Sequence, residues 1–208
     1  MEWDSDHMRA HGWAGRPPSD ATEARARILT ATRERLSEFG TTSTAEIAEH
    51  VGVTRQTVYR YFPTTEDLLN AAATEAVADL TADLVEHVRG HLAATGGDAG
   101  DAAVEVVAYV FEHLRGDPAL NRLIAPGRLG STVADLTSST SIDLGRTLIA
   151  GFGIDWDELG WDEARQRELV EHLLRTLQSL ILDPGDPVRT GPELREYLQR
   201  WLAPTVRG

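Results

Sequence analysis

The chain has 208 residues, of which 41% are hydrophobic, so it is long enough to bury a core and too apolar for a disordered chain. It contains no cysteine, which excludes a disulfide framework and a thiolate metal site. The formal net charge of −13 is unexpected for a protein that binds nucleic acid, so only a local cluster of positive charge can support that function.

The first residues, MEWDSDHMRAHGW, are charged and contain no hydrophobic run, and the chain has no stretch of about eighteen apolar residues. The sequence therefore predicts a cytoplasmic protein. Residues 1–19 lack periodicity and hold several Gly and Pro residues, which predicts a flexible N-terminal arm. Gly15-Arg16-Pro17 is similar to the short arms that some DNA-binding proteins lay in a minor groove, and an ordinary solvated tail is the alternative.

The first helix is predicted from Asp20, which can cap it together with Glu23, up to Gly40. The second helix starts at Ser43, which forms a capping box with Glu46. Both starts follow from the same chemistry, because a side-chain oxygen accepts a hydrogen bond from a backbone N–H group that the first turn leaves without a partner.

A short joint, Val51-Gly52-Val53, separates the second helix from a third one that Thr54 caps. Glycine lets the backbone of so tight a joint take a positive φ. Val58 and Phe62 are four residues apart and face inward, which leaves the polar residues of the third helix on the surface. This pattern is a helix-turn-helix signature, and its Arg and Gln side chains suit the edges of bases in a major groove.

The run GVTRQTVYRYF, followed by TTEDLL, resembles the recognition helix and the start of the fourth helix in the tetracycline-repressor (TetR) family of one-component regulators. In that family, a Lys that touches phosphate often stands where this chain has Thr65. From the residues and the resemblance together, the expected DNA contacts are Ser43, Thr54, Arg55, Gln56, Thr57, Tyr59, Arg60, Tyr61 and Thr65.

All positive side chains are arginines, and residues 1–70 carry eight of them against eleven acidic residues. Neither this part nor the remainder is basic overall. A group of arginines nevertheless falls around the predicted DNA-binding head, where it can neutralise phosphates: Arg25, Arg27, Arg33, Arg35, Arg55 and Arg60.

The rest of the chain follows helical periodicity throughout, without strand-like alternation. A long helix is predicted from Leu68 past Val88 to about Thr95. Further helices are predicted from Asp98 or Asp101 to Gly116, over 117–125, from Ser131, over 161–182, and from Pro192. We therefore expect an all-α fold of about nine helices, with a flexible arm (1–19), a helix-turn-helix DNA-binding domain (20–66) and a ligand-binding and dimerisation domain (67–208).

The resemblance implies that this helical body binds a small molecule and pairs with a second copy through its last two long helices. The aromatic and polar candidates for lining a pocket are Tyr109, Phe111, His113, Arg122, Phe152, Trp156 and Gln178. A wide apolar stripe over 161–182 favours a dimer seam, although both helices can instead complete the protomer's own core. The candidates for the dimer interface are Leu173, Leu177, Leu180, Tyr197 and Trp201.

The sequence thus predicts a ligand-responsive repressor that binds a near-palindromic operator as a homodimer and is released by a small-molecule inducer. Neither a cofactor nor enzymatic activity is expected. One alternative is a DNA-binding regulator whose body senses a protein partner or no ligand. The other is a metal-dependent enzyme, for which His87 and His91 lie four residues apart with Glu86 beside them, but no third metal ligand is evident.

Overall fold

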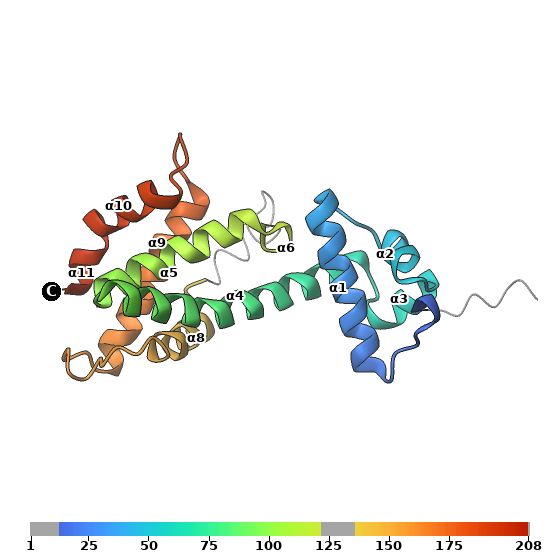
Figure 1. Cartoon of the computed structure of the whole chain (residues 1–208), viewed down its shortest axis with the longest axis horizontal. Coiled ribbons are helices and arrows are strands. Elements are labelled where there is room, and N and C mark those ends of the chain that lie inside the picture. The colour runs from blue at the N-terminus through green and yellow to red at the C-terminus, as the bar shows by residue number, and fades with distance from the viewer. Residues whose placement is uncertain (1–12, 122–135, 208) are drawn as a thin grey trace, which may run out of the picture. The chain divides into compact units, whose positions relative to one another are not determined.

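The computed structural model describes residues 13–121 and 136–207, which form ten α-helices, one short 3-10 helix and no strand (Figure 1). This confirms the predicted all-α class. The chain divides into two compact units, Met1–Ala76 and Val77–Gly208. The division falls within the long helix α4 (Thr65–Thr95), ten residues beyond the domain boundary expected from the sequence. Within the described ranges, no helix is long and apolar enough to cross a membrane.

The first unit contains three short-to-medium helices and the beginning of α4. Helix α1 (Ala21–Phe39) starts where Asp20 accepts a hydrogen bond from the Glu23 N–H at 2.8 Å, and it ends at Gly40 in the left-handed conformation. Helices α2 (Thr44–Val51) and α3 (Arg55–Tyr61) follow as predicted. One buried cluster joins all four helices: Ile28, Leu29, Ile47, Ala48, Val58, Phe62, Leu68 and Ala72.

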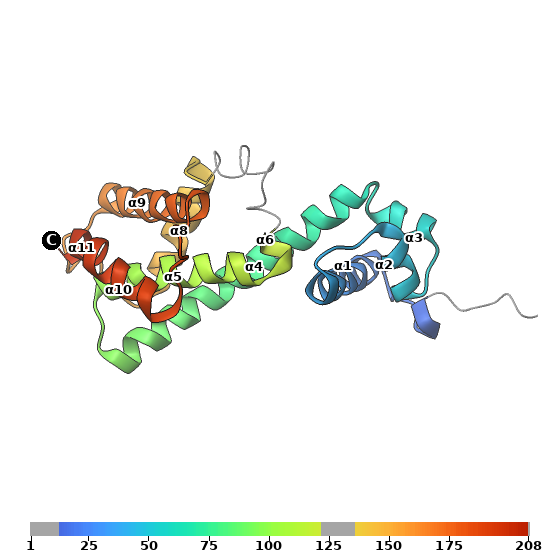
Figure 2. The ribbon, with the colours of Figure 1, turned by 90° about the horizontal axis from the view of Figure 1, so that it is seen from above.

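Helix α5 (Ala99–Gly116) is the central helix of the second unit, and Figures 1 and 2 show α10 (Gly191–Trp201) running beside it. The terminal helix α11 (Ala203–Arg207) was not separated from α10 in the sequence. It packs so closely on α5 that a Cβ at Gly100 would lie 3.1 Å from the Ala203 carbonyl oxygen. Arg207 then donates to Asp98 and Asp101 of the α5 N-terminus, each at 2.7 Å.

The remaining helices of the second unit are α6 (Pro118–Asn121), α8 (Ser139–Ala150) and α9 (Glu163–Leu182). The prediction that a helix opens at Ser131 and includes Leu136 is wrong for the described part of that segment. Ser138 has an extended backbone and caps α8 by accepting from the Ser141 N–H at 3.3 Å. The serine cap therefore starts the helix at Ser139, later than the apolar periodicity had suggested. Residues 131–135 lie outside the described ranges.

A buried carboxylate links three helices of the second unit. Glu105 of α5 is 3% exposed, and Arg195 of α10 donates to both of its oxygens, at 2.8 and 3.1 Å. His87 of α4 contacts the same carboxylate at 3.0 Å through Nε2. Arg195 also donates to Glu112, one of whose oxygens accepts the Gly191 N–H at 2.6 Å. This arrangement is favourable because each buried charge has a partner of opposite sign.

Replacing Glu105 with Gln should destabilise the protein by about 2 to 3 kcal/mol, because it leaves Arg195 without one of its carboxylates. This is below the usual cost of breaking a fully buried pair, since 29% of the Arg195 side chain stays exposed. Urea denaturation followed by circular dichroism measures the change. The exposed Glu86→Gln removes the same charge from α4 and serves as the control; equal effects of the two substitutions would contradict the role given to Glu105.

The same pair gives a pH dependence. Burial alone would raise the pKa of Glu105, but hydrogen bonds from Arg195 and His87 outweigh it and hold the pKa below 4.5. As the pH falls, the unfolded chain therefore takes up this proton first. The stabilisation by Glu105 is complete above the pKa of the unfolded chain and disappears as the pH falls through the pKa of the folded protein. When the pH is lowered through this range, the Glu105→Gln variant should therefore lose less stability than the unmodified protein.

Candidate nucleic-acid interface

The joint between α2 and α3 depends on one glycine. Gly52 has φ 73° and ψ 39°, the left-handed conformation, and its N–H donates to the Glu49 carbonyl at 3.1 Å. Val53 N–H donates to the Ala48 carbonyl at 2.8 Å, so the carbonyls at the end of α2 are satisfied within the turn. Residues with a Cβ rarely adopt this conformation. The structure therefore confirms the predicted positive φ at Gly52.

Helix α3 has one buried side and one exposed side. Val58 and Phe62 are 0% and 1% exposed and lie in the core of the first unit. Thr54 caps the helix by accepting from the Thr57 N–H at 3.2 Å. The two threonine hydroxyls also lie 3.0 Å apart, so Thr57 supports the cap as well as facing the surface. The apolar positions thus fix the rotation of α3 about its axis.

The predicted base-reading residues lie on the other side of α3. Arg55, Gln56 and Arg60 are exposed, and Tyr59 is 47% exposed. Thr57 and Tyr61 are half-buried. The structure therefore brings six predicted residues to one short helix, four of them with side chains open to solvent. Such an exposed set of arginine, amide and hydroxyl groups is able to donate to base edges and phosphates.

An arginine from α1 supports the end of α3. Arg25 donates to the Tyr61 carbonyl at 3.3 Å, and its guanidinium lies 4.3 Å from the centre of the Phe62 ring. A cation at a helix C-terminus stabilises the helix dipole. Next to it, Arg60 donates to the Tyr61 hydroxyl at 3.1 Å. Arg25 thus has a structural partner in the head, a role that its sequence position did not reveal.

The N-termini of α2 and α4 are joined side by side. Thr44 and Thr65 are the first residues of these helices, and their hydroxyl oxygens lie 2.8 Å apart. Ser43, a predicted DNA contact, is half-buried and caps α2, where hydrogen bonds from Ser43 hold the pKa of Glu46 below its ordinary value. The Thr65 hydroxyl is likewise hydrogen-bonded within the head, to Thr44. Both residues are therefore partly committed to the fold.

The segment before α1 folds back onto the helix-turn-helix. The Trp13 N–H donates to the Gly52 carbonyl at 2.9 Å, and its half-buried side chain packs against the core cluster. Arg27 of α1 contacts the Arg16 carbonyl, which fixes the same segment a second time. Residues 13–16 are thus attached to the head, in contrast to the free arm expected there. Residues 1–12 of the expected arm lie outside the described ranges.

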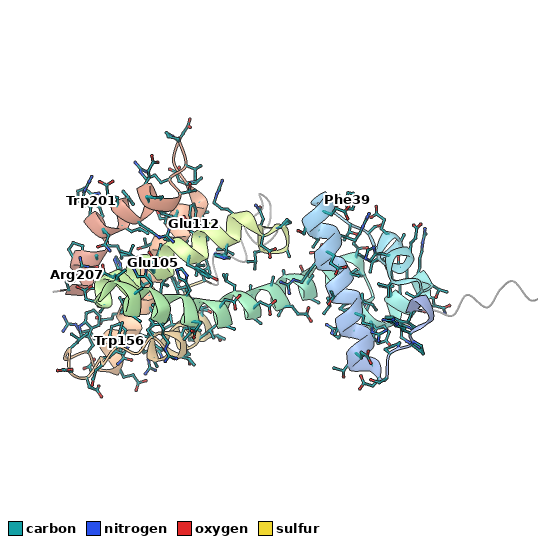
Figure 3. The ribbon with its side chains drawn as sticks, in the orientation of Figure 1. Phe39, Glu105, Glu112, Trp156, Trp201 and Arg207 are labelled. Atoms are coloured by element: carbon teal, nitrogen blue, oxygen red, sulfur yellow. The ribbon has the colours of Figure 1, made fainter. Side chains whose placement is uncertain are left out.

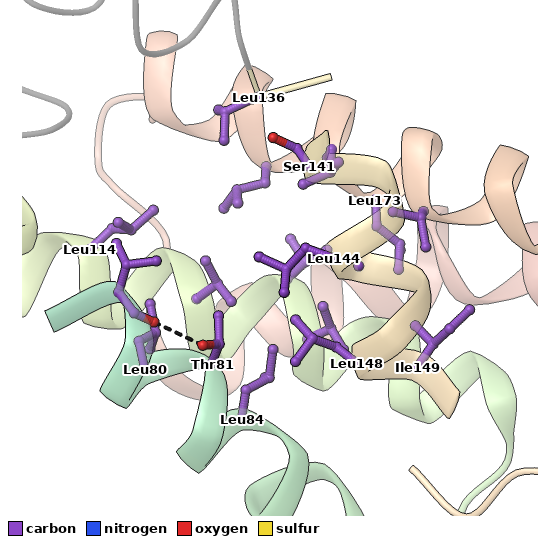
Figure 4. A pocket seen from close by; sticks show the side chains of 18 of the residues that line it. Leu80, Thr81, Leu84, Leu114, Leu136, Ser141, Leu144, Leu148, Ile149 and Leu173 are labelled. Atoms are coloured by element: carbon purple, nitrogen blue, oxygen red, sulfur yellow. Dashed lines mark hydrogen bonds between the residues drawn. The ribbon is translucent and has the colours of Figure 1, made fainter. Parts of the chain in front are cut away.

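The second unit contains an apolar cavity of about 250 Å³ between α4, α5, α8 and α9 (Figure 4). Phe152 is the one predicted pocket residue among those that line it. Figure 4 shows leucines from all four helices directed toward the space. The sequence did not identify these residues, because an apolar residue at helical spacing looks the same whether it fills a core or borders a cavity. The available signal was Gly145, because a glycine inside a helix indicates close packing at that point.

The other predicted pocket residues lie elsewhere. Tyr109 and His113 stack on each other with centroids 3.8 Å apart, and Tyr109 also contacts the His87 ring at 4.3 Å. Phe111 and Trp156 are buried, and the Trp156 indole N–H donates to the Ile149 carbonyl at 3.1 Å. Gln178 is half-buried on α9, and Arg122 lies outside the described ranges. The described residues among them are therefore not assembled around one space.

The proposed dimer residues divide into two groups. Leu173 and Leu177 are buried within the protomer and line the cavity, so their burial requires no second copy. Leu180 is half-buried, whereas Tyr197 and Trp201 are 37% and 66% exposed. Figure 3 shows Trp201 on the outer side of α10. An interface on α9 and α10 would therefore depend on Leu180, Tyr197 and Trp201.

The histidine pair has a structural explanation in part. His87 contacts the buried Glu105, and among the described residues no group of three or more His, Cys, Asp or Glu side chains is placed to hold a metal ion. His91 lies one turn further along α4 and is half-buried. The position of His87 is thus explained by the ion-pair network.

Comparison with known proteins agrees with the geometry of the head. The family model described as bacterial regulatory proteins, tetR family, matches residues 28–72, from α1 to the first turns of α4. The uncharacterized HTH-type transcriptional regulator Rv2250c of Mycobacterium tuberculosis (strain ATCC 25618 / H37Rv) is 31% identical over 101 residues, which cover 48% of this chain and 49% of that protein. Mb2274c of Mycobacterium bovis (strain ATCC BAA-935 / AF2122/97), another uncharacterized HTH-type transcriptional regulator, is 30% identical over the same length and shares. The chain thus spans about half the length of the curated relatives it matches.

Among solved structures, the fold is similar to that of the TetR family repressor AlkX from Dietzia sp. strain DQ12-45-1b, implicated in the biodegradation of n-alkanes. The TM-score is 0.55 at 19% sequence identity, and the match covers 88% of this chain and 95% of that one. At this identity the similarity concerns the fold. It includes the helical body as well as the head.

The turn at Gly52, the half-exposed α3 and the matched sequence define a helix-turn-helix DNA-binding domain. The chain is therefore similar to helix-turn-helix transcriptional regulators. Residues 28–72 match the TetR family's helix-turn-helix domain, and the chain as a whole is similar in fold to a TetR family repressor.

Replacing Gly52 with Ala should destabilise the protein by about 1 to 2 kcal/mol, because alanine is strained in the left-handed conformation. Asn tolerates this conformation better, so Gly52→Asn should cost less. The control is Gly90→Ala in α4, where no atom lies within 4 Å of the added Cβ and helix propensity favours alanine. Urea denaturation should give shifts of opposite sign for the two alanine substitutions; shifts of the same sign would contradict the requirement for glycine at position 52.

Proposed function

We propose that the protein is a ligand-responsive repressor whose α3 enters the major groove of an operator. The observation that carries this proposal is the division of α3 into a buried side, fixed by Val58 and Phe62, and an exposed side with Arg55 and Gln56. Arginine pairs with guanine and glutamine with adenine through two hydrogen bonds each, which gives sequence preference. Tyr59 and Arg60 are close enough on the same helix to contact the flanking backbone.

We further propose that two copies bind together. Trp201 and Tyr197 on α10, together with the exposed Leu182 at the end of α9, are large apolar side chains that solvent reaches in the protomer. Exposed apolar side chains of this size are typical of protein interfaces, where aromatic residues contribute much of the binding energy. A two-fold dimer would place its recognition helices about 34 to 36 Å apart and select a near-palindromic operator.

The cavity of the second unit supports regulation by a small molecule. Helix α4 contributes four lining residues, Val77, Leu80, Thr81 and Leu84, and the same helix begins in the DNA-binding unit. A ligand that fits one position of α4 better than another would shift the population of the two states. In this mechanism the inducer changes the spacing of the two heads and releases the operator. The cavity favours a small molecule over the alternative that the body senses a protein partner.

Replacing Arg55 or Gln56 with Ala should weaken operator binding by about 1 to 3 kcal/mol and relax the preference at one base position, because each side chain reads one base pair. The operator is first selected from a random DNA pool with the unmodified protein, and affinities are then compared by fluorescence anisotropy at fixed salt. The control is Arg115→Ala, which removes an exposed arginine from α5. An equal loss on operator and random DNA would show that Arg55 and Gln56 contact phosphates alone, and a winning sequence without two-fold symmetry would contradict the dimer.

Replacing Trp201 with Ala should raise the dimer dissociation constant at least tenfold, because it removes the most exposed aromatic side chain of α10 from the proposed interface. Analytical ultracentrifugation over a concentration series measures the change. Leu159→Ala is the matched control, since Leu159 is 50% exposed and lies outside α9 and α10. If both variants dimerise as tightly as the unmodified protein, the interface does not involve Trp201.

A further inference from the structure

The lining of the cavity has almost no polar character. Among the nineteen lining residues that the structure describes, the side chains with hydrogen-bonding groups are Thr81 and Ser141, and none is charged. The Thr81 hydroxyl donates to carbonyls of its own helix, at 2.9 and 3.0 Å, and the Ser141 hydroxyl lies 3.0 Å from that of Ser138. Both hydroxyls are thus already engaged within the protein, and Figure 4 marks a hydrogen bond of Thr81. A charged group of a ligand would be desolvated here without a partner, which is costly.

Two glycines let α8 and its C-terminal end approach the neighbouring helices closely. A Cβ at Gly145 would lie 2.4 Å from the Val170 side chain of α9, and one at Gly151 would lie 2.9 Å from the Val85 side chain of α4. Glycine inside a helix is unfavourable, and close packing of this kind explains its presence at position 145. Helix α8 therefore approaches both neighbours more closely than a residue with a Cβ would allow.

From this lining and the close packing of α8, we propose that the cavity binds an uncharged, mainly hydrocarbon ligand. An apolar protein cavity of about 150 Å³ accommodates benzene, so one of 250 Å³ has room for about ten carbon atoms in the same proportion. The inference rests on the proposed function, in which this cavity holds the inducer, and it specifies the chemistry of that inducer. The net charge of −13 adds long-range repulsion against anionic ligands, and the described part of the lining offers no acidic residue as a partner for cationic ones.

The test uses three probes with the same ten-carbon chain and different head groups: decan-1-ol, decanoate and decylammonium. Binding to the full chain is measured at neutral pH by isothermal titration calorimetry, without DNA. We expect decan-1-ol to bind at least tenfold more tightly than either ion. In a series of shorter alcohols, affinity should rise about fourfold for each added methylene, as burial of hydrocarbon predicts, and level off near ten carbons.

Two lining variants and two controls locate the site. Val110→Phe fills part of the cavity from α5 and should lower decan-1-ol affinity at least tenfold, whereas Ala150→Phe adds the same ring at an exposed position of α8 and should not. Thr81→Arg places a cation at the half-buried edge of the lining and should reverse the preference in favour of decanoate. Ala82→Arg adds the same charge one residue away on the exposed side of α4 and should leave the preference unchanged.

Equal affinity for the alcohol and either ion would overturn the proposal, as would decan-1-ol binding that Val110→Phe does not weaken. Operator binding is measured separately, which distinguishes failure of the inference from failure of the proposed function. If decan-1-ol binds in the cavity but does not release the operator, the ligand class is supported and the release mechanism fails. If the protein shows no preference among DNA sequences, the repressor function fails whatever the probes do.

Discussion

A helix of seven residues is too short to be stable alone, so the recognition surface depends on the packing that holds α3 in place. Burial of Val58 and Phe62 supplies most of that packing, and the Thr54 cap and Arg25 satisfy the two ends. The left-handed Gly52 lets α2 and α3 meet at an angle at which both bury their apolar residues. Because the inward side chains determine which side of α3 faces the core, they also determine which side chains face outward.

Charge limits how such a head holds DNA. Several of its arginines are engaged within the protein: Arg27 with Glu23, Arg35 with Glu46, and Arg25 with a backbone carbonyl. The N-terminus of a helix is in general a favourable site for an anion. The N-termini of α2 and α4, however, carry acidic capping residues. A single head therefore has few positive groups for phosphates, and non-specific affinity should be low and sensitive to salt. In the proposed function, pairing of two heads on one operator compensates for this weakness.

The head was predictable from the sequence because its signals are local. A capping box, a glycine turn and a pair of apolar residues four apart each act within a few residues, and Ser43, Gly52 and Val58 all behave as expected. The body was predictable as a set of helices but not as a site. Aromatic residues such as Trp156 were chosen for their chemistry, yet they pack in the core, while leucines and valines from four helices surround the cavity. Which apolar residues leave space between them depends on helix positions that no local pattern encodes.

The placement of the cavity lining along α4 explains why a ligand without polar groups is compatible with regulation. Val77, Leu80 and Leu84 recur every three to four residues on one side of the helix, and Ala72 in the DNA-binding unit lies buried on the turns that precede them. One continuous helix therefore has residues that line the cavity and residues that hold the head together. In the proposed function, van der Waals contact is enough to favour one position of α4, because a closely packed interior tolerates overlap poorly. The ligand needs to differ in its fit to two positions of α4, and its shape alone can provide that difference.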